Sequence, residues 1–494
     1  MPSFRLFNLP NELIVAILKA SEKPDLAAFI RTSHLSWDIG HPILYALTLE
    51  EKKQVFLWAA RHNQPGLVQY IINDLVPVLK KDAEYRRNAF RLASTSGCIQ
   101  IVGIALDHGA DPDLAKAIGA DQLEVVQLLL SRGARVVNGR NPLHFAASYG
   151  AKKVVEYLLS PNIAGVFDVD SHDDQYNTPL LKAARYGHTD VIKVLLAHKA
   201  GPNFINEVDE TALLAASKGG HGAAVKALLD GGANVNGVPV ISVLVDLSEQ
   251  ADTNPLLATF YELLEKKAFG TLDVRPDMET QLPAGYRATI RALLDRGADI
   301  TKVNYFTGLS ALDYATILGD PEVLRWILAH PPAKCHLNRE GKHGLAPLSY
   351  ATTNGAVCKL LLDAGASVAV DKNLALILAA KYRGKGAAEV LIARRPQHID
   401  CTNSIGQTAL AMAAMEGNKE IAQMLIKAGA DLNKPDCIGQ TPLGHAVANE
   451  YDDEVASLLR QAGARPGKPS GEYPEDRLHL WEDIVEAMRQ LDEP

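Results

Sequence analysis

The stretches Leu425–Asp431 (LIKAGAD) and Leu458–Ala464 (LLRQAGA) decide the fold, because each closes a helical pattern on a glycine, and Gly429 and Gly463 lie 34 residues apart. Gly297 and Gly365 are separated by twice that distance. The same block, two apolar residues followed by a short spacer and Gly-Ala, recurs at Leu128–Ala134, Leu228–Ala233, Leu293–Asp299 and Leu361–Ala366. A spacing held this closely predicts a chain built from repeated units rather than from one compact core.

Each unit carries the residues that begin and end helices. The glycine of the block follows the last helical turn, where the left-handed conformation is needed and glycine adopts it without strain. A threonine precedes the first helix of many units, and threonine is a good N-cap, with proline tolerated directly after it. These starts are Thr178-Pro179-Leu180, Thr211-Ala212-Leu213, Thr408-Ala409-Leu410 and Thr441-Pro442-Leu443. Paired alanines such as Ala183-Ala184 follow and let neighbouring helices approach closely.

The segment Asn141–Gly150 (NPLHFAASYG) and the two final units from Ile405 to Ala464 resemble the ankyrin repeat. The resemblance implies an all-α ankyrin-repeat solenoid of helix–turn–helix units joined by finger loops. We count about twelve units over residues 52–466, beginning with a degenerate unit at Val55–Asn73. His144 occupies the histidine position of the repeat signature, where the family uses a histidine to tie adjacent turns by hydrogen bonds.

One unit is interrupted by an insertion. Its first helix is predicted at Val238–Leu247 and its second at Tyr286–Arg296, which leaves an insertion at about 249–285. Insertions in solenoids map to loops on one side, often the binding side. The alternative is a tolerated surface insertion without a function.

Residues 4–49 do not follow the repeat. They contain Leu-Pro-x-Glu-Leu, then an apolar helix, an Asp-Leu step and a second helix, and they resemble the F-box. The resemblance implies an F-box-like helical module that docks a Skp-type adaptor of a cullin–RING ubiquitin ligase. The matching adaptor-docking positions are Leu9, Pro10, Leu13, Ile17 and Leu18. The alternative is a module that only caps the apolar end of the first repeat.

The C-terminal residues 472–494 follow a linker rich in proline and glycine. The pattern of apolar residues in this segment predicts one amphipathic, acidic helix with Leu478 and Trp481 on its apolar side. We expect it to cap the last repeat, and the alternative is a short helix that binds a partner.

Composition narrows the possible partners and the compartment. The formal net charge of −8 disfavours a nucleic-acid or anionic-membrane surface, so neither partner is expected. Five scattered cysteines without CxxC pairs indicate a reducing compartment, and no stretch has the length of a spanning helix or a signal peptide. We therefore expect a soluble monomer in the cytoplasm, the nucleus or both.

Motifs of catalysis are absent from the sequence. There is no phosphate-binding glycine-rich loop, GxSxG elbow or HExxH helix, and no histidine and cysteine set at zinc spacing. We predict no catalytic residue, no cofactor and no metal. Asp173 and Asp174 are read as solvated carboxylates of a finger loop.

The candidate site is a protein-binding surface. In ankyrin repeats, partners contact the finger loops and the exposed end of the inner helix, which the family places on a concave face. Mapped onto this sequence, the inner-helix ends are Ser148-Tyr149, Arg185-Tyr186, Ser217-Lys218, Ile317-Leu318, Lys381-Tyr382 and Met415-Glu416, and the finger candidates include Tyr176 and Phe306. Tyrosine and arginine are frequent interface hot spots, and Tyr149 and Tyr186 hold equivalent positions in successive units.

Two functions are compatible with these features. The first is a substrate receptor, in which the N-terminal module docks a ligase adaptor and the repeats hold the protein to be ubiquitinated. The second is an interaction scaffold or regulator without a ubiquitin role.

Overall fold

The computed structural model describes residues 48–63, 68–111, 113–134, 141–161, 163, 167–236, 282–304, 308–341, 344–368, 374–394, 398–448, 453–468, 478 and 482. They divide into two compact units. The first contains residues up to 183 and 190–201, and the second contains 184–189 and the chain from 202 onward. Each unit is described by itself.

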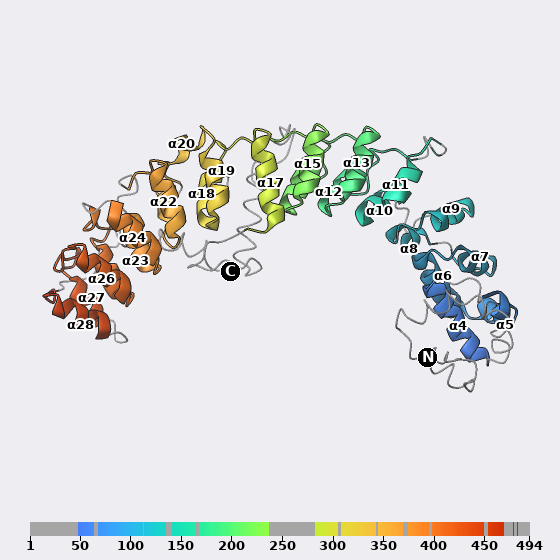
Figure 1. Ribbon diagram of the computed structural model, residues 1–494, viewed down its shortest axis with the longest axis horizontal. Coiled ribbons are helices and arrows are strands. Elements are labelled where there is room, and N and C mark those ends of the chain that lie inside the picture. The colour runs from blue at the N-terminus through green and yellow to red at the C-terminus, as the bar shows by residue number, and fades with distance from the viewer. Residues whose placement is uncertain are drawn as a thin grey trace, which may run out of the picture. The chain divides into compact units, whose positions relative to one another are not determined.

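The first unit is a series of paired helices (Figure 1). Its helices are α4 (Leu49–Arg61), α5 (Val68–Lys81), α6 (Ala83–Ser96), α7 (Ile99–Asp107), α8 (Leu114–Gly119), α9 (Leu123–Ser131), α10 (Pro142–Tyr149), α11 (Lys152–Leu158), most of α12 (Pro179–Arg185) and most of α13 (Thr189–Ala197). The even-numbered helices α4 to α10 contact one another in sequence and form an inner layer, while α7, α9 and α11 form an outer layer.

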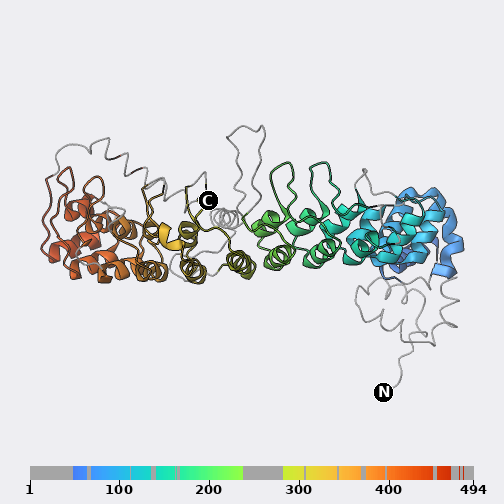
Figure 2. The same cartoon turned by 90° about the horizontal axis from the view of Figure 1, so that it is seen from above.

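The second unit, taken by itself, also has two layers of helices. Its helices are α14 (Ala212–Lys218), α15 (Gly222–Asp230), α17 (Ala284–Asp295), α18 (Ala311–Leu318), α19 (Pro321–Leu328), α20 (Ala333–His336), α21 (Pro347–Tyr350), α22 (Gly355–Asp363), α23 (Leu374–Lys381), α24 (Lys385–Arg394), α25 (Ala409–Met415), α26 (Lys419–Lys427), α27 (Pro442–Ala448) and α28 (Asp453–Gln461). Helices α18, α21, α23, α25 and α27 contact in turn as the inner layer. In Figure 2 the loops that precede α14, α25 and α27 project to one side of these helices.

The all-α solenoid expected from the sequence is confirmed. The Thr408 side chain accepts a hydrogen bond from the Ala411 N–H at 3.1 Å and caps α25, as predicted for the threonine of each unit. The glycine of all six blocks has a positive φ, for example 88° at Gly429. Paired alanines such as Ala413 and Ala414 are almost fully buried, which explains why only small residues fit there.

Adjacent repeats approach so closely that there is no room for a side chain at some glycine positions. A Cβ added at Gly285, in α17, would lie 2.4 Å from the carbonyl oxygen of Gly220. The structure also corrects the bounds of the second helix of the interrupted repeat. Its second helix begins at Ala284, just after Pro283, and ends at Asp295, rather than spanning Tyr286–Arg296. Pro283 is the N-cap residue, with a non-helical ψ of 139°, and the helix starts at the residue after it.

Several sequence predictions lie outside the described residues. They are the F-box-like module at 4–49 apart from its last two residues, the first helix of the interrupted unit, the insertion as far as residue 281, and the C-terminal helix apart from Leu478 and Glu482.

Candidate functional site

Four finger loops share one turn, built on an aspartate or asparagine side chain. Asp173, Asn206, Asn403 and Asp436 each use one side-chain oxygen to accept hydrogen bonds from the N–H groups two and four residues later, at 2.8–3.2 Å. The third residue after each of them has a positive φ. Asparagine and aspartate favour such turns because their short side chains replace a backbone acceptor. The finger loops are therefore locally fixed rather than free to change conformation.

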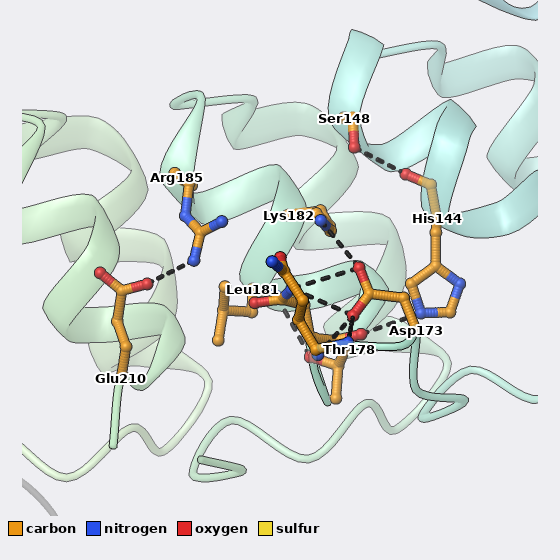
Figure 3. Close-up of polar contacts among 10 residues, drawn as sticks. His144, Ser148, Asp173, Thr178, Leu181, Lys182, Arg185 and Glu210 are labelled. Carbon is orange, nitrogen blue, oxygen red and sulfur yellow. Dashed lines mark hydrogen bonds and ion pairs between the residues drawn. The ribbon is translucent and has the colours of Figure 1, made fainter. Parts of the chain in front are cut away.

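His144 ties adjacent turns by a hydrogen bond, as predicted for the histidine of the repeat signature. Its Nε2–H donates to the carbonyl oxygen of Asn177 at 3.0 Å, across from α10 to the finger loop before α12 (Figure 3). Burial lowers the pKa of His144, and the bond to Asn177 opposes that shift only in part. The ring is thus a neutral structural donor in this position.

Asp173 is not the solvated carboxylate that the sequence suggested. It lies 2.8 Å from the Lys182 ammonium and accepts bonds from Asn177 (Figure 3). Burial alone would raise the pKa of Asp173, but the ion pair with Lys182 and the bonds from Asn177 lower it to about 2. The sequence does contain a signal for this structural role, which is the repeat of an aspartate or asparagine at the same place in successive units. Asp173 and Asn206 are 33 residues apart, as are Asn403 and Asp436.

Arg185, a predicted concave-face residue, is engaged within the second unit. Its guanidinium lies 2.5 Å from a carboxylate oxygen of Glu210, in the finger loop before α14 (Figure 3). The predicted residue Lys381 is also paired, at 2.9 Å from Glu416. These pairs fix the edges of the inner helices to neighbouring loops, and they reduce the positive charge that the surface presents.

Three predicted tyrosines present their rings to solvent. Tyr149, at the end of α10, and Tyr186, directly after α12, are 56% and 57% exposed, and Tyr176 in the finger loop is 57% exposed. The Tyr149 ring also packs against Phe145, with 4.7 Å between the ring centres, so its position is fixed. Tyr149 and Tyr176 belong to the first unit and Tyr186 to the second, so the adjacency of Tyr149 and Tyr186 stays a prediction.

The remaining predicted residues divide into three groups. Four of them are half-buried at or next to the ends of α10, α14, α23 and α25, namely Ser148, Lys218, Tyr382 and Met415. Ser217, Ile317 and Leu318 are buried, so their predicted place on an exposed helix end is wrong. Phe306 and the adaptor-docking residues Leu9, Pro10, Leu13, Ile17 and Leu18 lie outside the described residues.

The burial of Ile317 and Leu318 has a cause that the sequence contains. Every residue of α18 is buried, and Asp313 is its only charged residue. A helix that is apolar all round belongs in a core and presents no exposed end. The apolar composition of α18 therefore predicts its burial better than its position in the repeat does.

Two further kinds of feature, a metal-binding cluster and a membrane-spanning helix, are absent from the part of the chain that the structure describes. No group of three or more histidine, cysteine, aspartate or glutamate side chains is placed to hold a metal ion there. Among the same residues no helix combines the length and apolarity of a membrane-spanning segment.

Comparison with known proteins gives similarity over long stretches. Ankyrin repeat and KH domain-containing protein mask-1 of Caenorhabditis elegans is 28% identical over 264 residues, which is 51% of this chain and 10% of that protein. Probable 26S proteasome regulatory subunit p28 of Saccharomyces cerevisiae is 35% identical over 23% of this chain and 55% of its own length. E3 ubiquitin-protein ligase KEG of Arabidopsis thaliana is 25% identical over 56% of this chain and 17% of its own length. The chain thus spans less than two thirds of each of these relatives.

A family model described as ankyrin repeats (3 copies) matches residues 114–166, 163–238, 312–403 and 376–469. These matches cover more than half of the chain and include the helices that carry Tyr149, Arg185 and Lys218. Ankyrin repeats mediate protein–protein interaction. With the capped helix pairs and the finger turns, the match shows that this chain belongs to the ankyrin repeat family.

Proposed function

We propose that this chain is a non-catalytic protein-binding adaptor that serves as the substrate receptor of a Skp/cullin/F-box ubiquitin ligase. The repeats would hold the protein to be ubiquitinated, and residues 4–49 would dock the Skp-type adaptor. Such a receptor acts in the cytoplasm or the nucleus.

The observation that carries the binding role is the exposure of aromatic rings on fixed elements. Tyr149, Tyr176 and Tyr186 are each more than half exposed, although their loops and helices are held by turns, caps and ion pairs. Exposed tyrosines on a rigid support lose little conformational entropy when a partner covers them. This makes the three rings the best candidates for interface hot spots.

The ubiquitin role is supported by the N-terminal sequence. An apolar stripe made by Leu13, Ile17 and Leu18 follows Leu9-Pro10, the pattern by which the segment resembles the F-box. Two of the relatives, a ubiquitin-protein ligase and a proteasome regulatory subunit, carry names from the ubiquitin system.

The binding role is tested by Tyr149→Ala combined with Tyr186→Ala. We expect partner capture from a cell extract to be lost while the midpoint of thermal unfolding changes little, because both rings are largely exposed. The control Tyr157→Ala removes a half-buried ring from the outer helix α11 and should leave capture intact. Full capture by the double variant would move the site elsewhere, first to the 249–285 insertion.

The ubiquitin role is tested by co-purification with a Skp-type adaptor. We expect wild type to bring down the adaptor and Leu13→Asp to lose it, because a charge on the apolar stripe is costly to bury. The circular dichroism of the repeats should be the same in both proteins. A wild-type protein that never binds the adaptor would leave the chain as a scaffold or regulator whose residues 4–49 only cap the stack.

A further inference from the structure

An apolar patch is exposed on the finger loop that precedes α14. Phe204, Ile205 and Val208 are 41%, 41% and 68% exposed, although they stand within five consecutive residues. The loop is held in one conformation by the Asn206 side chain, whose Oδ1 accepts from Val208 N–H and Glu210 N–H. The three apolar side chains therefore form a fixed feature, which we call the finger patch together with Glu207 and Asp209.

A second finger of the same unit shows what this position does when it serves packing. Ile405 stands two residues after Asn403, as Val208 does after Asn206, but it is only 2% exposed. Its carbonyl oxygen accepts from Cys437 N–H at 3.0 Å in the next finger. A Cβ on the following Gly406 would lie 2.8 Å from that same nitrogen. At 403–406 the turn locks two fingers together, whereas the equivalent Val208 keeps most of its surface exposed.

The charged residues of the loop itself are all acidic. Residues 201–211 contain Glu207, Asp209 and Glu210 and neither lysine nor arginine. Glu210 forms an ion pair with Arg185. Glu207 and Asp209, the two immediate neighbours of Val208, have no ion-pair partner among the described residues. An exposed apolar surface flanked by carboxylates is complementary to a cationic partner that carries apolar side chains.

We propose that the finger patch binds a basic peptide segment bearing apolar side chains, with Phe204 and Val208 covering the apolar groups and Glu207 and Asp209 facing the cations. This inference rests on the proposed protein-binding function and specifies the chemistry of the partner. Burial of the apolar side chains supplies affinity, while the carboxylates select the sign of the charge and speed association at low salt.

The test measures fluorescence anisotropy of three labelled synthetic peptides of equal length with the full chain. In one peptide lysine alternates with leucine, in the second lysine alternates with serine, and in the third glutamate alternates with leucine. We expect the lysine–leucine peptide to bind about tenfold more tightly than either of the others, because it alone offers both interactions. Equal binding of the glutamate–leucine peptide would overturn the proposal.

Two double variants locate the binding. Glu207→Gln with Asp209→Asn neutralises the patch, and asparagine tolerates the left-handed backbone at residue 209. Glu340→Gln with Glu389→Gln makes the same change in net charge at two exposed residues elsewhere. We expect the first variant to lose about tenfold in affinity for the lysine–leucine peptide and the second to match wild type. Equal loss in both variants would mean general adsorption to an acidic protein and would refute the patch.

The apolar contribution has its own variant, Phe204→Asn with Val208→Asn. It should reduce binding of the lysine–leucine peptide to the level of the lysine–serine peptide, and unchanged binding would contradict the proposal. Failure of this inference differs from failure of the proposed function. If the peptides do not discriminate but Tyr149→Ala with Tyr186→Ala still abolishes partner capture, the adaptor role stands and only the partner chemistry is wrong.

Discussion

Close packing between successive repeats is tested most sharply by Gly384→Ala. Gly384 lies just before α24, and a Cβ at this position would lie 1.6 Å from the carbonyl oxygen of Thr352. Its φ is not in the left-handed region, so the substitution would otherwise stabilise the protein by about 0.4–1 kcal/mol. The neighbour is backbone, so no side-chain rotation relieves the contact.

The expected loss in free energy of unfolding depends on which segments must move to relieve the contact. Relief of the contact requires α24 and the α21–α22 turn to separate by more than an ångström, which weakens the packing of Ala387 and Ala388 in the core. A gap of 0.5–1 Å already forfeits about a quarter to a half of a van der Waals contact. Overpacking costs about 1–3 kcal/mol in general, and we expect the upper end here, about 3 kcal/mol, because the backbone itself is displaced.

Two matched controls separate this clash from other effects of a glycine substitution. Gly429→Ala places a side chain at φ 88° in open space and should cost only the left-handed penalty of about 1–2 kcal/mol. Gly103→Ala, inside α7 and also in open space, should stabilise by about 0.5–1 kcal/mol. Urea unfolding followed by circular dichroism should rank the midpoints Gly103→Ala, wild type, Gly429→Ala and Gly384→Ala, from highest to lowest. A Gly384→Ala midpoint at or above that of wild type would refute the packing.

Three further predictions concern caps and buried titratable groups. Thr408→Ala should lower the free energy of unfolding by about 1 kcal/mol in urea titration, and Thr408→Ser should restore it, because the hydroxyl caps α25. Burial raises the pKa of Asp313 from 3.8 to about 6, so its protonated form stabilises the fold at low pH and this contribution is lost as pH rises to about 6. Asp313→Asn should therefore gain stability relative to wild type between about pH 4 and 6 and keep that gain above it; a pH-independent difference would contradict this. Burial lowers the pKa of His144 below 6.5, so the unfolded chain takes up the proton first and stability should fall as pH drops below about 6.5. His144→Gln should show a smaller fall across that range in the same titration, and an undiminished fall would place its cause elsewhere.

The helix boundaries could be predicted from sequence because their signals are local. A threonine such as Thr408 and a glycine such as Gly429 act on their own helix, and the structure shows the expected cap and the expected positive φ. Pro283 marks the start of α17 in the sequence, and the predicted start at Tyr286 was two residues too late. The close approach of Gly285 to Gly220, by contrast, joins two repeats, and local signals do not report it.

Only part of the candidate binding surface could be predicted from the sequence. Exposed tyrosines at helix ends follow from the repeat register, which holds for Tyr149 and Tyr186. The ion pair between Arg185 and Glu210 joins a helix end to the next finger loop, so it depends on geometry between segments 25 residues apart. The repeat position gives the wrong prediction at α18. Its position in the repeat predicts an exposed helix end, but the residues of α18 are mostly apolar and all are buried.

The central claim, that one chain bridges a ligase adaptor and a captured partner, is tested most directly by a bridging assay. A Skp-type adaptor is immobilised, and retention of the partner first captured by the repeats is measured with and without this chain. We predict retention only in the presence of the wild-type chain, with loss for Leu13→Asp and for Tyr149→Ala combined with Tyr186→Ala. Partner retention by Leu13→Asp equal to that by wild type, or binding of the partner with no binding of the adaptor by wild type, would contradict the account.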